Sequence, residues 1–317
     1  MAPTILIIGA TGNTGKGVVY SLSKLLASKN NNYRILGLTR SLNNLTSQKL
    51  ASLPLVEMQE KDWTTIDANW LKEQEVVKAY VAPHNLPDQF VDESALYVAM
   101  LQAGVKYLVK LSTSSDRVSP SSQIYYGRAH WAIESQLSQP EFKSLQWTSL
   151  QANLFTSVLI DSIAGWIKQY QKTGNQEVLK TVLAADVPVG VIDPEEVGKI
   201  GAHFLALDDP TPHNQARYIL SGPEDVTGRR LVEIVEQYAG VKVKDVEYKD
   251  VSWIKYMTTA GYPEKSLPSL LLSCEAAWQG KSSLSATPTS KEVIELAPPK
   301  HTIADVLKAV MEALAFF

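Results

Sequence analysis

The sequence has very little cysteine and no long apolar segment. Cys274 is the single cysteine among 317 residues, so the chain cannot form an internal disulfide, and the paired Cys and His spacing of a zinc site is missing. This usage is typical of a reducing compartment. The apolar run at residues 5–8 is too short for a signal peptide or a membrane span, and no basic residue precedes it. We therefore expect a cytoplasmic protein that makes no membrane contact.

An excess of either charge is also missing. Lys and Arg number 30 against 33 Asp and Glu, which gives a net charge of -3 at pH 7. Nucleic acids and acidic membranes attract proteins that cluster Lys and Arg, and no basic stripe accompanies the seven tryptophans. The Walker A, HEXXH, nucleophile-elbow and EF-hand patterns are absent as well. We expect no nucleic-acid contact, no metal site and a small molecule as the partner.

The first half of the chain alternates strand-length apolar segments with helix-length amphipathic ones. Residues 5–8 form a wholly apolar run that stops at Gly9, which is typical of a strand buried on both faces. Further strands are expected at 33–40, 55–62, 76–83, 105–115 and 145–152, and helices from about residue 15 and at 91–104. This rhythm predicts an α/β Rossmann fold over residues 1–155, a doubly wound parallel sheet with helices on both faces.

The rhythm changes after Phe155. A helix is predicted at 156–170, and a second helix begins where Asp193 can act as the N-cap and Pro194 suits the first turn. Strand, helix and strand segments follow, and 301–314 predicts a closing helix. We expect residues 156–317 to form a smaller α/β substrate lobe, partly intertwined with the Rossmann sheet. The polar, Ser- and Thr-rich stretch 279–292 predicts an exposed loop.

A glycine motif lies between the first strand and its helix. Gly9, Gly12 and Gly15 are spaced three apart in the sequence Gly-Ala-Thr-Gly-Asn-Thr-Gly. Glycines at this junction permit a tight turn and a close approach of a pyrophosphate, whose charge the helix N-terminus favours. The motif predicts a nicotinamide dinucleotide site. Its candidate contact residues are Gly9, Thr11, Gly12, Asn13, Thr14 and Gly15.

The residue after the second strand indicates which dinucleotide is bound. A site specific for NAD usually has an Asp or Glu here, which accepts hydrogen bonds from the ribose hydroxyls. This chain has Arg40, flanked by Thr39 and Ser41. A guanidinium beside hydroxyl groups suits a dianionic 2′-phosphate. Arg40 and Ser41 therefore predict NADPH/NADP as the cofactor.

Several motifs together resemble the NmrA-like branch of the atypical short-chain dehydrogenase/reductases. They are the glycine motif at 9–15, Arg40, the sequence HWAIE at 130–134 followed by a strand, and QANLF at 151–155. The stretch from 187 onward, with its Asp-initiated helix, also looks like that branch. The resemblance implies either an NADPH-dependent reductase, as for quinones, isoflavones or lignans, or a transcriptional regulator that binds the dinucleotide without turnover and acts on a protein partner.

The resemblance also indicates where a catalytic group would lie. Typical short-chain dehydrogenases use a Ser, a Tyr and a Lys four residues after the Tyr. Here Tyr126 is followed four residues later by His130, and Thr113 precedes Tyr126 by 126 - 113 = 13 residues. Thr113, with Ser112 as its neighbour, retains the hydroxyl that would orient a substrate carbonyl. The candidate catalytic residues are therefore Ser112, Thr113, Tyr126 and His130.

His130 in the lysine position leaves the mechanism open. An imidazole is only partly cationic at neutral pH unless a carboxylate raises its pKa, and Glu134 four residues later is the expected partner. Either Tyr126 donates the proton, or His130 and the hydroxyls position the substrate, as the resemblance to NmrA-like quinone reductases implies, or the protein holds its cofactor without turnover. Tyr125 is an alternative to Tyr126, because the helix register is open.

Two further loops are expected to contact the cofactor. Ala82 and Pro83 end the fourth strand, and Asn153 and Phe155 follow the sixth. The carboxyl ends of parallel strands meet at one edge of the sheet, where dinucleotides bind. Ser112 and His130 are expected at the same edge. The sequence thus predicts an NADPH-dependent reductase of a small conjugated or aromatic carbonyl or imine compound, with the regulator as the alternative.

Replacing Arg40 with Asp tests the cofactor assignment. The substitution removes a cation from the predicted 2′-phosphate and adds an anion, so we expect NADPH affinity to fall by about 100-fold or more. NADH lacks that phosphate and should lose much less. Fluorescence titration of both dinucleotides measures the difference, and equal losses would contradict the assignment.

Overall fold

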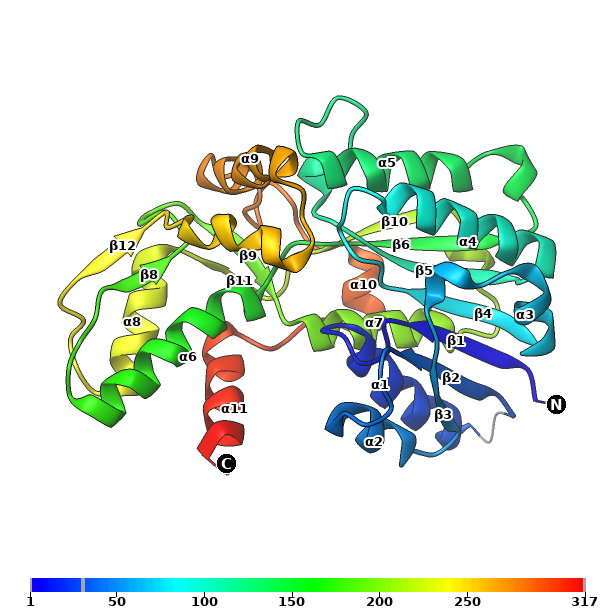
Figure 1. Cartoon of the computed structure of the whole chain (residues 1–317), viewed down its shortest axis with the longest axis horizontal. Coiled ribbons are helices and arrows are strands. Elements are labelled where there is room, and N and C mark those ends of the chain that lie inside the picture. Colours follow the sequence, from blue (N-terminus) through cyan, green and yellow to red (C-terminus); the bar gives the residue numbers. More distant parts are fainter. Residues whose placement is uncertain (1, 30–31, 316–317) are drawn as a thin grey trace.

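A parallel seven-stranded sheet forms the centre of the protein in the computed structural model, which describes residues 2–29 and 32–315. The strand order is β10-β6-β5-β4-β1-β2-β3 (Figure 1). The chain order reverses between β1 and β4, which creates the crevice where ligands bind in such sheets. The strands are β1 (Thr4–Ile8), β2 (Arg34–Thr39), β3 (Val56–Glu60), β4 (Val76–Val81), β5 (Tyr107–Ser112), β6 (Gln146–Ala152) and β10 (Ala216–Leu220). The predicted doubly wound fold is confirmed.

Strand β1 shows why this sheet needs helices on both faces. Its five residues are all fully buried. Successive side chains alternate between faces, so Ile5 and Ile7 pack into one core and Leu6 and Ile8 into another. A strand that is buried at every position needs a helical layer on each face of the sheet.

The two helical layers come from different parts of the chain. The first face is covered by α1 (Gly15–Ser28), α7 (Pro194–Leu205) and α10 (Lys291–Leu296), with α2 (Leu45–Ala51) beside β3. The other face is covered by α3 (Ala68–Glu73), α4 (Gln89–Ala103) and α5 (Tyr125–Leu137). Gly104 ends α4 in the left-handed conformation, and the Asp193 side chain caps α7, both as predicted. Short 3-10 turns complete the loops at η1 (Trp63–Thr65), η2 (Ser115–Arg117), η3 (Pro140–Phe142), η4 (Thr211–His213), η5 (Ser252–Ala260) and η6 (Glu264–Ser266).

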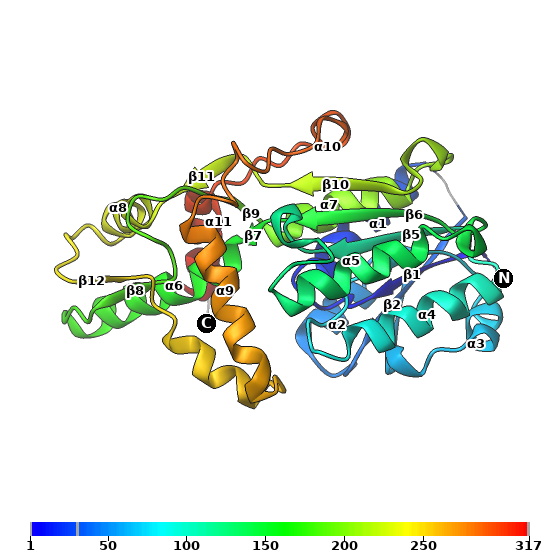
Figure 2. The same cartoon turned by 90° about the horizontal axis from the view of Figure 1, so that it is seen from above.

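A smaller lobe stands beside the carboxyl ends of the sheet (Figure 2). Two small sheets, β11-β9-β7 and β12-β8, and four helices surround its own apolar core. The chain does not stay in this lobe, because α7 packs against α1 and β10 pairs with β6. The lobe consists of β7 (Leu154–Phe155), β8 (Leu179–Thr181), β9 (Val189–Ile192), β11 (Glu224–Val226), β12 (Val246–Tyr248), α6 (Thr156–Thr173), α8 (Gly228–Ala239), α9 (Leu267–Trp278) and α11 (Ile303–Ala315).

The segment 279–292 is in part the exposed loop that its composition predicts, but three of its hydroxyl residues are buried. Ser282, Ser283 and Thr287 are buried, and the Ser282 carbonyl accepts a hydrogen bond from the Gly190 amide at 2.8 Å. Small hydroxyl side chains can be buried when each finds a partner, so polarity alone does not place a segment at the surface. In the described part of the chain, no helix has both the length and the apolar character that crossing a bilayer requires.

A glycine contact between α1 and α7 predicts a large loss of stability. A Cβ added at Gly198 would lie 2.1 Å from the Thr14 carbonyl oxygen, a backbone atom that cannot rotate away. We expect Gly198→Ala to lower the free energy of unfolding by about 3 kcal/mol or more. Gly165→Ala in α6 is the control, because a Cβ added there would meet no neighbouring atom within 4 Å. It should raise the free energy of unfolding by about 0.5–1 kcal/mol. Urea unfolding measures both, and equal changes would show that the contact does not restrict this position.

Candidate functional site

A cavity of about 390 Å³ opens beyond the carboxyl ends of β1, β4, β5 and β6. The loops that follow these strands form its walls, and α5 and α6 add residues from the other side. Most of the site residues predicted from the sequence meet here. They are Gly9, Gly12, Asn13, Thr14, Ala82, Pro83, Ser112, Thr113, Tyr126, His130, Asn153 and Phe155.

The glycine loop forms one end of the cavity. Gly9 has a φ of +79°, and its carbonyl accepts a hydrogen bond from the Gly12 amide at 2.9 Å. A Cβ at Gly15 would lie 2.0 Å from the same carbonyl oxygen, so α1 begins directly against the turn. At Gly12 the one atom near such a Cβ, among the residues that the structure describes, is the Gly9 oxygen at 3.1 Å. The remaining space at Gly12 and the start of α1 make a cradle that fits a pyrophosphate.

Arg40, Ser41, Thr11 and Gly15 do not line this cavity. Gly15 lies beneath the loop, and Arg40 is exposed at the carboxyl end of β2. The guanidinium of Arg40 forms no hydrogen bond or ion pair with any residue in 2–29 or 32–315. Beside it, the Ser47 hydroxyl donates to the Ser41 carbonyl at 2.9 Å, which fixes the turn. Arg40 is therefore available to an external anion at the rim of the site.

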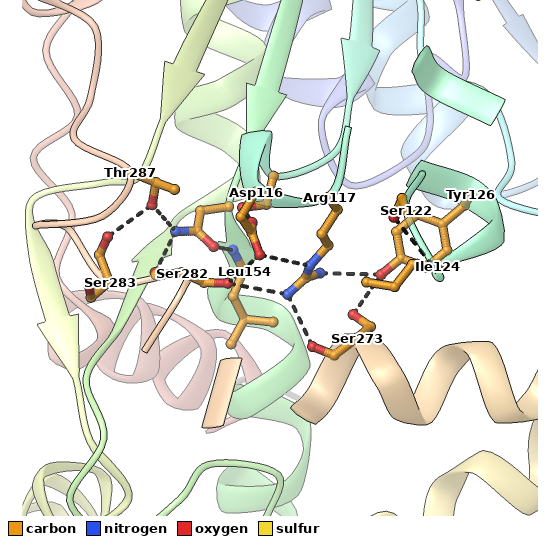
Figure 3. Close-up of polar contacts among 12 residues, drawn as sticks. Asp116, Arg117, Ser122, Ile124, Tyr126, Leu154, Ser273, Ser282, Ser283 and Thr287 are labelled. Atoms are coloured by element: carbon orange, nitrogen blue, oxygen red, sulfur yellow. Dashed lines mark hydrogen bonds and ion pairs between the residues drawn. The ribbon is translucent and has the colours of Figure 1, made fainter. Parts of the chain in front are cut away.

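Tyr126, and not Tyr125, faces the cavity. The Tyr126 hydroxyl donates to the Ser273 hydroxyl at 2.6 Å and accepts from Nη1 of Arg117 at 3.2 Å (Figure 3). The Tyr125 hydroxyl instead donates to the Asn85 carbonyl. The register of α5 thus places one phenol at the centre of the site and uses its neighbour to hold a loop.

His130 is a neutral imidazole and not the partly cationic group expected. Its ring is buried, and Nζ of Lys110 lies 3.1 Å from Nδ1. Burial, together with the charge of Lys110, holds the pKa of His130 well below its ordinary 6.5. A neutral ring at this position can orient a ligand through a hydrogen bond, whereas it adds no positive charge to the site.

The expected pairing of His130 with Glu134 is wrong. The Glu134 carboxylate accepts hydrogen bonds from Ser149 at 2.7 Å and from Nε of Arg217 at 2.9 Å. It also accepts from the Ser112 hydroxyl at 2.9 Å. Residues four apart share a helix face, but the neighbouring strands attract the carboxylate away from the cavity. Arg217 on β10, far along the chain, supplies the compensating charge.

Two of the predicted polar residues have side chains that are already occupied. Ser112 donates its proton to Glu134, and the Asn153 amide donates to the Ser282 carbonyl at 2.8 Å and to the Thr287 hydroxyl at 3.1 Å. Thr113 forms no side-chain hydrogen bond with any described residue. Of the two adjacent hydroxyls, Thr113 is therefore the one available to a ligand. Asn153 instead ties the segment 279–292 to the cavity wall.

The model of the NmrA-like family matches residues 1–290 of the sequence. The chain belongs to the NmrA-like family. A comparison with functionally curated proteins gives no significant match. The chain is also similar to solved structures of several kinds at low sequence identity.

The similar structures include two reductases and one regulator. Triphenylmethane reductase from Citrobacter sp., complexed with NADP(H), shares 20% identity at a TM-score of 0.72, over 96% of this chain and 99% of that one. The NADPH-dependent quinone oxidoreductase QOR2 from Escherichia coli shares 19% sequence identity at a TM-score of 0.71. The match covers 97% of this chain and 99% of that one. NmrA, a negative transcriptional regulator in complex with NADP, shares 14% sequence identity at a TM-score of 0.71. The match covers 99% of this chain and 98% of that one. At these identities the likeness establishes the shared fold, and the fold is used both for catalysis and for regulation.

This NmrA-like chain has a second chamber of about 320 Å³ beside the first. The two share five wall residues, which are Asn85, Arg117, Tyr126, Leu154 and Val158. The other walls come from the smaller lobe. They are mostly apolar or aromatic, with Ser273 as the polar exception, and include Trp253, Met257, Tyr262, Leu270 and Trp278. The cavity at the glycine loop therefore continues into a pocket of the smaller lobe.

Sequence reasoning missed two groups of residues at this site. Arg117 lines both chambers, yet it lies in a polar turn that belongs to no motif. Behind His130, Lys110 forms a fully buried ion pair with Glu93 at 3.4 Å, and Gln89 donates to the same carboxylate at 3.0 Å. One sequence signal exists for this pair: Gln89 and Glu93 are polar residues four apart on the buried face of a helix. Such residues are rarely buried without partners.

The pKa values of His130 and His301 are shifted in opposite directions, so one titration can test both assignments. We expect His130 to stay neutral from pH 8 down to 6.5, because burial and the charge of Lys110 hold its pKa well below 6.5. Nδ1 of His301 donates to the Asp193 carboxylate at 2.7 Å, and this contact raises the pKa of His301, so the same range should show it titrating above 6.5. Histidine ring chemical shifts followed by NMR report both. A titration of His130 near neutrality would contradict the role given to Lys110.

Proposed function

We propose that the protein is an NADPH-dependent reductase of small conjugated or aromatic compounds that carry a carbonyl or imine group. The observation that carries the proposal is the shared wall between the two chambers. One chamber has a glycine cradle for a dinucleotide, the other is mainly apolar, and Tyr126 lies where they meet. A redox reaction between a dinucleotide and an apolar substrate needs this arrangement.

The residues present fit NADPH. The loop of Gly9, Gly12 and Gly15 would hold the pyrophosphate against the start of α1, and Arg40 would pair with the 2′-phosphate. When bound, this cofactor supplies the hydride, and the protein supplies orientation, proton transfer and exclusion of water. Ala82 and Pro83 on one side and Phe155 on the other would form the walls of the dinucleotide site.

The second chamber supports a flat, mainly apolar substrate. Trp253, Tyr262 and Trp278 line it, and aromatic side chains pack well against conjugated rings. Its volume of about 320 Å³ is at the lower end of the range for small-molecule sites. A substrate held there presents its reacting group toward Tyr126 and the first chamber.

The chain offers two proton-bearing groups at this point. Tyr126 would donate its proton to the substrate atom that gains negative charge during reduction, and the Thr113 hydroxyl would orient that atom. His130, held neutral by burial and Lys110, would orient the ligand by a hydrogen bond without proton transfer. The substrate, rather than Ser273, would accept the Tyr126 proton when it occupies the chamber.

The alternative function is a dinucleotide-binding regulator with a protein partner. The neutral His130 supports the regulator. It stands four residues after Tyr126, where typical short-chain dehydrogenases have a Lys, and it adds no positive charge that would activate the phenol. NmrA, a regulator of similar fold, supports it as well. The two functions differ in one measurable property, which is oxidation of NADPH by the purified protein.

NADPH consumption with a panel of quinones, enones and cyclic imines tests the reductase. We expect turnover with at least one class, and we expect Tyr126→Phe to lower kcat by about 100- to 10,000-fold while the Kd for NADPH stays the same. Tyr256→Phe, on a side chain that is 61% exposed, is the matched control and should match the wild type. Tight NADPH binding without turnover on any class, together with a co-purifying protein partner, would favour the regulator.

A further inference from the structure

Arg117 is a nearly buried cation at the junction of the two chambers. It ends the 3-10 turn η2 after β5, its side chain is 11% exposed, and it lines both cavities. Figure 3 shows the guanidinium directed toward Tyr126 and Ser273. A charged group removed from water at the centre of a cavity needs partners, so its contacts indicate what it is there to bind.

The contacts of Arg117 leave hydrogen-bonding capacity unused. Nη1 donates to the Tyr126 hydroxyl at 3.2 Å, and Nη2 donates to the Ser273 carbonyl at 3.4 Å and to the Ser282 hydroxyl at 3.5 Å. These are long bonds to uncharged atoms. Nε is buried and donates to no described residue. Guanidinium groups prefer shorter bonds to anionic oxygens, of about 2.7–2.9 Å.

Asp116 compensates the charge of Arg117 only in part. Its Oδ2 atom lies 3.7 Å from Nε, and within residues 2–29 and 32–315 it is the one carboxylate paired with this guanidinium. The same carboxylate accepts hydrogen bonds from Ser114 and from Ser282, the latter at 3.3 Å. The hydroxyl groups thus hold the carboxylate at a distance and leave the guanidinium directed at the cavity.

We propose that Arg117 is a catalytic residue that binds the substrate oxygen as it becomes negatively charged and then stabilises the phenolate left on Tyr126. The proposal rests on the proposed reductase activity. Among the described groups that contact the Tyr126 hydroxyl, Arg117 is the cation, because Ser273 is neutral. His130, the other polar group of α5 in this cavity, carries no charge.

When bound, NADPH would supply a hydride to a carbon of the conjugated system and be left as NADP⁺, and the electron pair displaced from the carbonyl π bond would go to the substrate oxygen. The Tyr126 O–H bond breaks, an O–H bond to that oxygen forms, and the negative charge moves to the Tyr126 oxygen beside Arg117. A proton from water, passed through the Ser273 hydroxyl, restores the phenol.

This role narrows the substrate class. A fixed cation favours a substrate whose reduction places charge on oxygen, such as a quinone or an enone. It disfavours a substrate that enters as a cation, because two positive charges would then share an apolar cavity. The carbonyl members of the proposed substrate class are therefore preferred over protonated imines.

Binding of 4-nitrophenol to the NADP⁺-loaded protein tests the role of Arg117 without turnover. Its absorbance distinguishes the ionised form from the protonated one. We expect the wild type to bind the ionised form, even at a pH below the pKa of free nitrophenol, and Arg117→Gln to weaken that binding about 10- to 100-fold. Nitrobenzene, which cannot ionise, should bind both proteins equally, as followed by quenching of Trp253 and Trp278.

Two further variants control the experiment. Arg229→Gln removes a surface guanidinium paired with Asp186 and should leave both ligands unaffected. Arg117→Lys keeps a cation and should retain part of the preference for nitrophenolate. If the wild type binds only the protonated form, or if Arg117→Gln weakens nitrophenolate and nitrobenzene alike, the proposal is wrong.

The binding test separates this proposal from the proposed function. Selective nitrophenolate binding that depends on Arg117 without NADPH turnover on any substrate would leave the oxyanion site established and the reductase refuted. If Arg117→Gln changes neither turnover nor nitrophenolate binding, the reductase is established and the role of Arg117 is refuted. Equal thermal unfolding temperatures of the variants would show that they share the wild-type fold.

Discussion

The close backbone contact between α1 and α7 is the constraint on which the rest of the site depends. Gly198 of α7 lies so near the Thr14 carbonyl that no side chain fits between the two helices. Thr14 immediately precedes α1, and Tyr80 of β4 also donates a hydrogen bond to its hydroxyl at 3.0 Å. The glycine loop is therefore held from a neighbouring helix and a neighbouring strand at once. A loop fixed in this way is preorganised for a ligand, which reduces the entropy lost on binding.

Buried charges are divided between the two sides of α5. Toward α4, Lys110 pairs with Glu93, and toward β10, Glu134 pairs with Arg217. Each pair neutralises itself, so neither gives net charge to the cavity between them. Arg117 lies outside both pairs, and Asp116, 3.7 Å from its Nε atom, compensates its charge only in part. The positive charge at the centre of the cavity thus comes from Arg117 in the turn after β5, and α5 supplies Tyr126, the group that Arg117 contacts.

Local patterns in the sequence predicted most of the fold and the cofactor end of the site. Strand β1 and the glycine loop depend on residues adjacent in the chain, and Gly104 and Asp193 act within one helical turn. The failures concern contacts between distant segments. Neither the partners of Glu134 nor the burial of three hydroxyl residues in 279–292 can be deduced from spacing, because both depend on where β10 and the lobe place their side chains. Arg117 acquires its role from Tyr126 and Ser273, and the second of these is far away in sequence.

The return of the chain from the lobe to the sheet has a consequence for how the protein folds during synthesis. Helix α7 and strand β10 are translated long after β1 and α1, yet they complete one face and one edge of the central sheet. A ribosome that has released only the first half of the chain exposes an unpaired β6 edge and an uncovered apolar face on α1. Topologies with such distant contacts fold slowly, and their intermediates are prone to aggregation. The sheet that carries the dinucleotide site is therefore complete only after β10 and α7 have been made.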